Sequence, residues 1–198
     1  MFLEAGYLVY ILFLLVFTVL AGVRFAKTKK AATAILALLF TVGAYCFFEF
    51  SFLPLPLNMK GLQAIGDSMV PLSETVVWIP FSRLADYVAS YGKEGFRYYF
   101  QTWMLPLLLA GFFMGFSFRG LTRKPASLLR CAVFSVSVPC GALLVSFAVR
   151  LFTGVLWKPV DVTNILYFAG AFWLAIFLQG MLQRLFRRER GGRRNEKM

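Results

Sequence analysis

The sequence predicts an all-α polytopic membrane protein with five transmembrane helices and an external amphipathic or re-entrant segment. Of its 198 residues, 60% are hydrophobic and 15% are charged, whereas a soluble domain has about 45–50% apolar and about 25% charged residues. The mean hydropathy is +0.72. The apolar residues lie in blocks long enough to cross a hydrocarbon core, which takes about 20 residues of helix. These properties exclude a single soluble domain and a disordered chain.

Five apolar blocks reach this length, and each is apolar on all sides, as lipid-facing helices are. The predicted spans cover residues of about 5–23, 31–53, 98–118, 128–149 and 162–185. They form one transmembrane domain over residues 1–187, and a basic tail follows over residues 188–198. No basic residue precedes the first block, so we interpret it as an uncleaved span and not as a signal peptide.

Three basic segments predict the topology. They are the first short loop, the loop after the third span and the C-terminal tail, with Arg24, Lys27, Lys29, Lys30, Arg119, Arg123, Lys124, Arg130, Arg184, Arg187, Arg188, Arg190, Arg193, Arg194 and Lys197. Because basic segments stay in the cytoplasm, we expect a bacterial plasma-membrane protein with the N-terminus outside and the C-terminus cytoplasmic. Residues 54–97 are then external. The net charge of +12 follows from this topology, so we expect membrane lipids and no nucleic acid as partners.

The composition argues against several kinds of catalytic centre. The chain has no histidine, and its cysteines, Cys46, Cys131 and Cys140, lie in or at the ends of apolar blocks with no metal-site spacing. The absence of histidine also removes Ser-His and Cys-His catalysis. We therefore expect no metal, no cofactor and a non-enzymatic function.

The external segment carries many apolar residues for a loop. From Ser82 the pattern predicts an amphipathic helix with Ser82 as its N-cap and Gly92 as its terminator. Such a helix lies in the plane of the membrane interface. The preceding residues 75–81 are too short to span, so they either enter the outer leaflet or pack against the bundle.

One short motif in this segment suggests a protease. Gly66-Asp67-Ser68-Met69-Val70-Pro71 resembles the serine box of type I signal peptidases and LexA-like self-cleaving repressors, in which the serine is the nucleophile and a lysine is its base. Such a lysine must be desolvated to act. Lys93 and Lys158 follow on the same side, but neither lies in a strand-rich stretch, and the segment is too short for the catalytic β-domain. A membrane serine protease using Ser68 is therefore one alternative function.

A longer set of motifs covers about residues 77–179. The matching positions, in order, are Ile79-Pro80-Phe81, Pro106, Ser146, Lys158, Asp161, Asn164 and Gly170-Ala171. In their order and spacing they resemble the VanZ-like family of small membrane proteins. Val77, Arg150 and Thr153 stand where that family has Asn, Glu and Gln. The resemblance implies a cell-envelope protein that lowers sensitivity to lipidated glycopeptide antibiotics of the teicoplanin type.

Polar residues at the outer ends of the spans form a candidate binding site. An ionised side chain inside a span costs about 2.5–3.5 kcal/mol on insertion scales, so it is usually paired or faces a cavity. The predicted site consists of Glu49, Pro80, Phe81, Ser146, Arg150, Lys158, Asp161 and Asn164. We expect it to face outward and to take the polar head of an amphiphilic envelope lipid or a lipoglycopeptide. A structural Glu49–Arg150 ion pair is the alternative interpretation.

Two questions stay open at this point. Glu49, Arg150 and Asp161 also suit a membrane-embedded lipid-processing enzyme or a small transporter. Gly111 and Gly115 form a small-xxx-small pattern that allows close helix approach, within the bundle or between two copies of the chain. The sequence does not decide the oligomeric state.

Overall fold

The computed structural model describes residues 31–52, 76–121, 127–153 and 160–195, together with scattered positions between 12 and 26. Within this part of the chain, four helices are long and apolar enough to cross a membrane. Of the predicted first span, only the scattered positions are described, and each of them is helical. The described part of the chain is thus helical, and four of its helices are suited by length and composition to a membrane protein.

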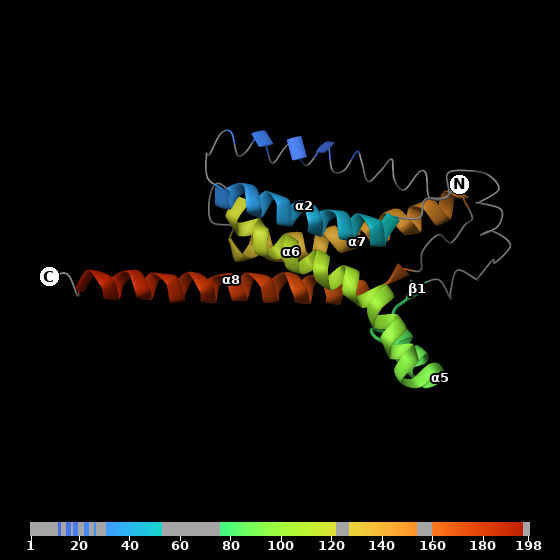
Figure 1. Cartoon of the computed structure of the whole chain (residues 1–198). Helices are drawn as coiled ribbons and strands as arrows, with labels where there is room; N and C mark the ends of the chain where they lie inside the picture. The colour runs from blue at the N-terminus through green and yellow to red at the C-terminus, as the bar shows by residue number, and fades with distance from the viewer. Residues whose placement is uncertain are drawn as a thin grey trace.

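The long helices are α2 (Ala31–Phe52), α6 (Leu105–Leu121), α7 (Leu128–Thr153) and α8 (Thr163–Asn195). They run alongside one another, and α6 lies between α2 and α8 and packs most extensively against both (Figure 1). Strand β1 (Val76–Val77) and helix α5 (Ser82–Tyr99) lie at the end of the bundle away from the C-terminus. We call this end the strand end.

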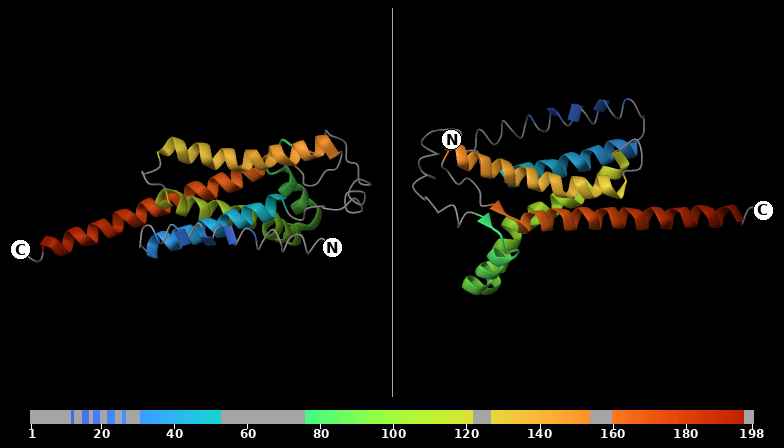
Figure 2. Two further views of the ribbon diagram at one scale, coloured as in Figure 1. Left: turned by 90° about the horizontal axis from the view of Figure 1, so that it is seen from above. Right: turned by 180° about the vertical axis from the view of Figure 1, so that it is seen from behind.

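The described helices match the predicted spans closely at several boundaries. Helix α2 ends one residue before its prediction, and α7 starts at the predicted residue 128. Helix α8 differs, because it continues to Asn195 and projects beyond the other helices (Figure 2). Residues 188–195 of the predicted tail therefore extend the last helix, although Gly191 and Gly192, which disfavour helix, lie within them.

Close backbone contacts position α6 in the bundle. A methyl group on Gly115 would lie 2.5 Å from the carbonyl oxygen of Phe172 on α8, and one on Gly111 would overlap the carbonyl group of Phe168. On α2, a methyl group on Gly43 would lie 2.9 Å from the side chain of Met114. The small-xxx-small pattern therefore serves contacts within the bundle, where small residues let helix backbones approach.

An aromatic cluster fills the space between α6, α7 and α8. The ring centroids of Phe118 and Phe134 lie 4.5 Å apart, and each ring packs on Phe172 at 5.6–5.7 Å. Phe47 of α2 packs edge-on against Phe168 at 5.1 Å. Such pairs contribute about 0.5–1.5 kcal/mol each beyond their buried area, so these rings fix the helices relative to one another.

The amphipathic helix predicted from Ser82 is present as α5, with two differences in detail. Phe81 is its N-cap residue, so the prediction of Ser82 as N-cap is wrong by one position. Gly92 has a φ of +57° and interrupts the helix, as predicted, but the chain does not leave it. After Gly92 the chain reverses direction and forms a second short helical segment, so that Gly95 lies against the backbone of Tyr87. This hairpin continues through the π-helix η1 (Phe100–Met104) into α6.

We predict that Gly115→Ala lowers the melting temperature of the purified protein in detergent. The added methyl group meets backbone atoms of Phe172, which cannot rotate away, and overpacking of this kind costs about 1–3 kcal/mol. Gly170→Ala is the matched control, since no atom lies within 4 Å of a methyl group there. Equal melting temperatures for the two variants would contradict this packing.

Candidate functional site

A pair of two-residue strands brings distant parts of the chain together. Strand β1 pairs in parallel with β2 (Val160–Asp161), with Val76 opposite Val160 and Val77 opposite Asp161. The amide of Val162 also donates to the carbonyl oxygen of Val77, at 3.3 Å. The residues before α5 are thereby held at the first turn of α8. Val77 and Phe81 contact the start of α8, whereas Trp78 and Ile79 between them are exposed. Entry of this segment into the outer leaflet therefore stays a prediction.

The Ile79-Pro80-Phe81 motif forms the turn between β1 and α5. Phe81 adopts a φ of +65°, a left-handed conformation that costs a non-glycine residue about 1–3 kcal/mol. Two contacts hold it there. Its amide donates to Oγ1 of Thr163 at 3.0 Å, and its ring packs on Tyr167 with the centroids 5.8 Å apart. The predicted Phe81 thus anchors α5 to α8.

Asp161 stabilises the start of α8, where Thr163 accepts the amide of Phe81. Its side chain is 2% exposed, and Oδ1 accepts the amide of Thr163 at 2.8 Å. Amide groups in the first turn of a helix have no partner within the helix, and a carboxylate there also interacts favourably with the helix dipole. The buried carboxylate therefore has a clear structural role at the start of α8. We call β1, β2, Phe81 and Thr163 the junction.

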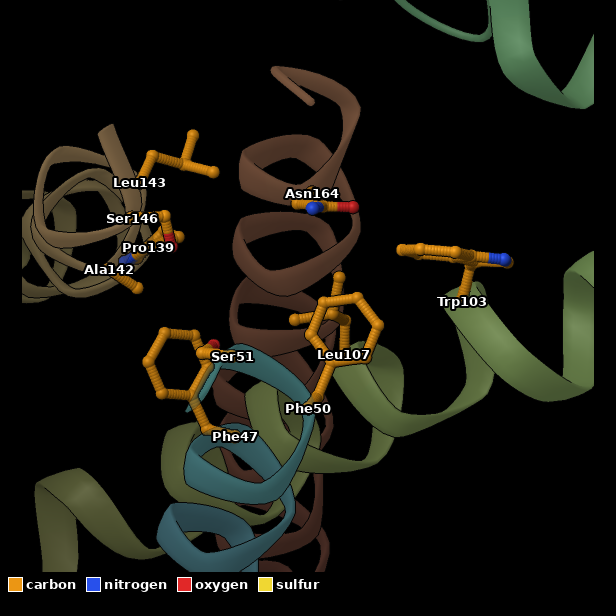
Figure 3. Close-up of a pocket in the computed structure, with 10 residues that line it drawn as sticks. All are labelled: Phe47, Phe50, Ser51, Trp103, Leu107, Pro139, Ala142, Leu143, Ser146 and Asn164. Carbon is orange, nitrogen blue, oxygen red and sulfur yellow. The ribbon is translucent and has the colours of Figure 1, made fainter. Parts of the chain in front are cut away.

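A narrow pocket lies beside the junction, between α2, α6, α7 and α8. Its volume is about 20 Å³, and we call it the polar slot. Its lining residues are Phe47, Phe50, Ser51, Trp103, Leu107, Pro139, Ala142, Leu143, Ser146 and Asn164 (Figure 3). A space of this size holds about one water molecule or one small polar group.

The polar groups of the slot come from three different helices. Ser51 belongs to α2, Ser146 to α7 and Asn164 to α8, and all three side chains are buried. In Figure 3, Asn164 lies between Ser146 and Trp103. Hydroxyl and amide groups both donate and accept hydrogen bonds. None of the residues that line the slot in the described part of the chain is ionisable, so the slot suits a neutral polar group.

Trp103 forms one wall of the slot and lies in the π-helix η1. The amide of Leu105 donates to the carbonyl group of Phe100, the five-residue spacing of a π-helix. Pro106 follows directly. Proline has no amide proton and its ring clashes with the preceding turn, and the helix widens directly before this proline. Single π-turns of this kind occur frequently at functional sites.

The indole of Trp103 is held from two sides. The ring of Phe50 packs edge-on at 5.9 Å, and the guanidinium group of Arg83 lies over the indole face at 5.2 Å. The buried Nε1–H has no hydrogen-bond partner among the described residues. A buried donor without a partner costs about 1–3 kcal/mol, so this end of the bundle contains a donor that an added acceptor can use.

The structure brings together five of the predicted site residues. Ser146 and Asn164 line the slot, while Asp161 and Phe81 belong to the junction, with Pro80 in the turn before it. These side chains reach one region although they come from three separate segments of the chain.

The other predicted site residues are not part of this arrangement. Glu49 is exposed and does not line the slot, although Phe50 and Ser51 beside it do. Arg150 belongs to α7, but its side chain lies outside the described residues, as do Lys158 and the alternative nucleophile Ser68. The predicted Glu49–Arg150 pair therefore stays a prediction.

Ser51, Trp103 and Thr163 were not among the residues predicted from the sequence. The sequence signal that could have indicated them is an indole N–H and two hydroxyl groups near the ends of apolar blocks. They were overlooked because serine, threonine and tryptophan are frequent at membrane interfaces for other reasons. Only the junction shows that Thr163 is the acceptor for Phe81.

Comparison with known proteins gives no relative: no family model, no curated protein and no solved structure matches the chain. The resemblance to the VanZ-like family therefore rests on the quoted motifs alone.

We predict that Thr163→Val lowers the melting temperature in detergent, whereas Thr163→Ser leaves it nearly unchanged. Valine has almost the same shape but cannot accept the amide of Phe81, and the loss of one buried acceptor costs about 1–3 kcal/mol. Serine keeps the hydroxyl group. If both variants melt at the wild-type temperature, the bond between Phe81 and Thr163 does not stabilise the junction.

Proposed function

We propose that this protein is a VanZ-like membrane protein of the bacterial cell envelope. It binds the polar end of an amphiphile at the strand end and lowers sensitivity to lipidated glycopeptide antibiotics of the teicoplanin type. The proposal is carried by the junction, because β1 and β2 place two of the motifs that resemble that family, Ile79-Pro80-Phe81 and Asp161 to Asn164, in direct contact. The polar slot lies next to this contact.

The position of the slot fits a ligand that enters from the lipid. The apolar part of α8 begins at Thr163, so Asn164 lies close to the surface of the hydrocarbon layer. An acyl chain anchored in the same leaflet would bring a polar head to this depth. The slot has room for about one small polar group, so it binds a hydroxyl or amide group of the ligand while the remainder stays outside.

The chemistry of the slot supports binding rather than catalysis. Ser51, Ser146 and Asn164 offer neutral donors and acceptors from three helices. A reaction would need a general base or an activated nucleophile within hydrogen-bond reach. The described lining residues include no carboxylate and no lysine, which is why we place binding ahead of a lipid-processing enzyme.

We further propose a five-span topology in the bacterial plasma membrane, with the strand end outside. The basic residues support this orientation, because the helix α8 carries Arg187, Arg188 and Arg190 at the opposite end from the junction. A cytoplasmic position of these bases follows the positive-inside rule. The junction and the slot then face the outer surface, where a glycopeptide acts.

The test is the growth inhibition of a teicoplanin-sensitive bacterium that expresses the protein. We predict a several-fold higher inhibitory concentration of teicoplanin than in cells with an empty vector. The effect should be lost with Asn164→Leu and reduced with Ser146→Ala, because each removes hydrogen-bonding groups from the slot. Vancomycin, which has no acyl chain, should show little change.

Ser137→Ala provides the matched control for Ser146→Ala. Ser137 lies on the same helix, but it is exposed and does not line the slot. Membrane levels of all variants are compared by immunoblot. Equal protection by the Asn164→Leu variant at equal membrane level would exclude the slot as the binding site, and no protection by the wild-type protein would exclude the function.

A further inference from the structure

A second cavity lies on the α5 hairpin, away from the polar slot. It is an open cavity of about 430 Å³, lined by Tyr87, Tyr91, Glu94, Gly95 and Tyr98, and we call it the tyrosine cavity. Its volume is within the range of about 300–1,000 Å³ found for small-molecule sites. None of its residues lines the slot, so this inference does not rest on the proposed function.

The backbone of the hairpin creates this cavity. Gly92, with its φ of +57°, reverses the direction of the chain, and Gly95 then packs directly on the carbonyl group of Tyr87. The contact leaves no space for a side chain at Gly95 and brings the tyrosines of both segments together. The ring centroid of Tyr87 lies 5.8 Å from that of Tyr98 and 6.5 Å from that of Tyr91.

The tyrosine side chains remain available to a ligand. Tyr91 is 68% exposed and Tyr98 is 54% exposed. In the described part of the chain, the cation–π contact found is that of Arg83 with Trp103, so no basic side chain of the described residues covers the tyrosine faces. Glu94 is exposed and lines the cavity.

This combination of side chains recognises a particular kind of charge. The faces of aromatic rings carry negative potential and attract organic cations within about 6 Å of the ring centre. Several rings together with a carboxylate suit an alkylated ammonium group, which is bulky, positively charged and only weakly hydrated. Within the cavity itself, Glu94 disfavours an anionic group.

The surroundings indicate that the cation belongs to a lipid. The hairpin lies at the strand end of the bundle (Figure 1), where the apolar part of α8 begins. Phe96 of the hairpin and Trp78 of the turn before it are exposed, and tryptophan and tyrosine gather at the level of lipid headgroups. Lys93 and Arg97 are exposed on the same short segment and do not line the cavity. They provide partners for a phosphate attached to the ammonium group.

We infer that the tyrosine cavity binds the ammonium headgroup of a zwitterionic phospholipid. The rings of Tyr91 and Tyr98 and the carboxylate of Glu94 hold the ammonium group, and the exposed bases contact the phosphate. The site anchors the α5 hairpin at the membrane surface, directly after the turn that leaves the junction.

Native mass spectrometry of the purified full-length protein tests this inference. The protein is incubated with an equal mixture of phosphatidylcholine and phosphatidylglycerol with identical acyl chains, and the bound lipids are counted. We expect a preference for phosphatidylcholine that falls about ten-fold in the Tyr91→Ala/Tyr98→Ala variant, since two cation–π contacts are lost. The Tyr91→Phe/Tyr98→Phe variant keeps both rings and should retain most of the preference.

Glu94→Gln provides a second variant that does not depend on the rings. Glu94 is exposed, so its substitution leaves folding intact, and we expect it to weaken the preference for phosphatidylcholine several-fold. This variant decides the question if the double alanine variant does not fold. A wild-type protein that binds both lipids equally, or a preference unchanged in Glu94→Gln and in the folded alanine variant, would overturn the inference.

A soluble cation shows whether the cavity binds the ammonium group of a lipid or a free organic cation. Tetramethylammonium chloride is added to the same mixture, and its own binding is followed by the melting temperature of the protein. We expect it to displace phosphatidylcholine only at high concentration, because it lacks the phosphate and the acyl chains. Stabilisation by tetramethylammonium together with no lipid preference would assign the cavity to a free organic cation and overturn the lipid assignment.

Discussion

The contact between Phe81 and Thr163 is the constraint on which the strand end depends. Phe81 stays in a left-handed conformation that is unfavourable for a residue with a side chain, and the bond to Thr163 and the packing on Tyr167 offset this cost. The contact fixes the direction in which α5 leaves the bundle. It also places β1 beside β2, so that the turn before α5 and the first turn of α8 form one unit.

The helices of the bundle give this unit its position. Gly111 and Gly115 bring α6 into backbone contact with α8, and this contact sets the depth of Trp103 relative to Asn164. Pro106 directly follows the π-turn in which Trp103 lies. The polar slot is thus a consequence of the backbone contacts at Gly111 and Gly115, which do not line it. Its small volume follows from the close approach of the same helices.

The spans were predictable and the junction was not, for a physical reason. A membrane-spanning helix is determined by its own apolar length, and for this reason the limits of α2 and the start of α7 agree with the sequence. The junction depends on residues more than eighty positions apart, and two strands of two residues each have no periodicity. Ser146, Asp161 and Asn164 were found because of their motifs, whereas Thr163 and Trp103 have roles that only the packing of other segments creates. The side chains of Arg150 and Lys158 lie outside the described residues, so their predicted roles stay predictions.

The most direct test of this account is a disulfide bond across β1 and β2. Paired residues on neighbouring strands lie about 5 Å apart, within the range that a disulfide bridges. In a chain whose native cysteines are replaced by serine, Val76→Cys and Val160→Cys should form an intramolecular disulfide in membranes after mild oxidation, detected by peptide mass spectrometry. The pair Val88→Cys and Val160→Cys should not form one. No disulfide between positions 76 and 160, or equal yields for both pairs, would contradict the junction.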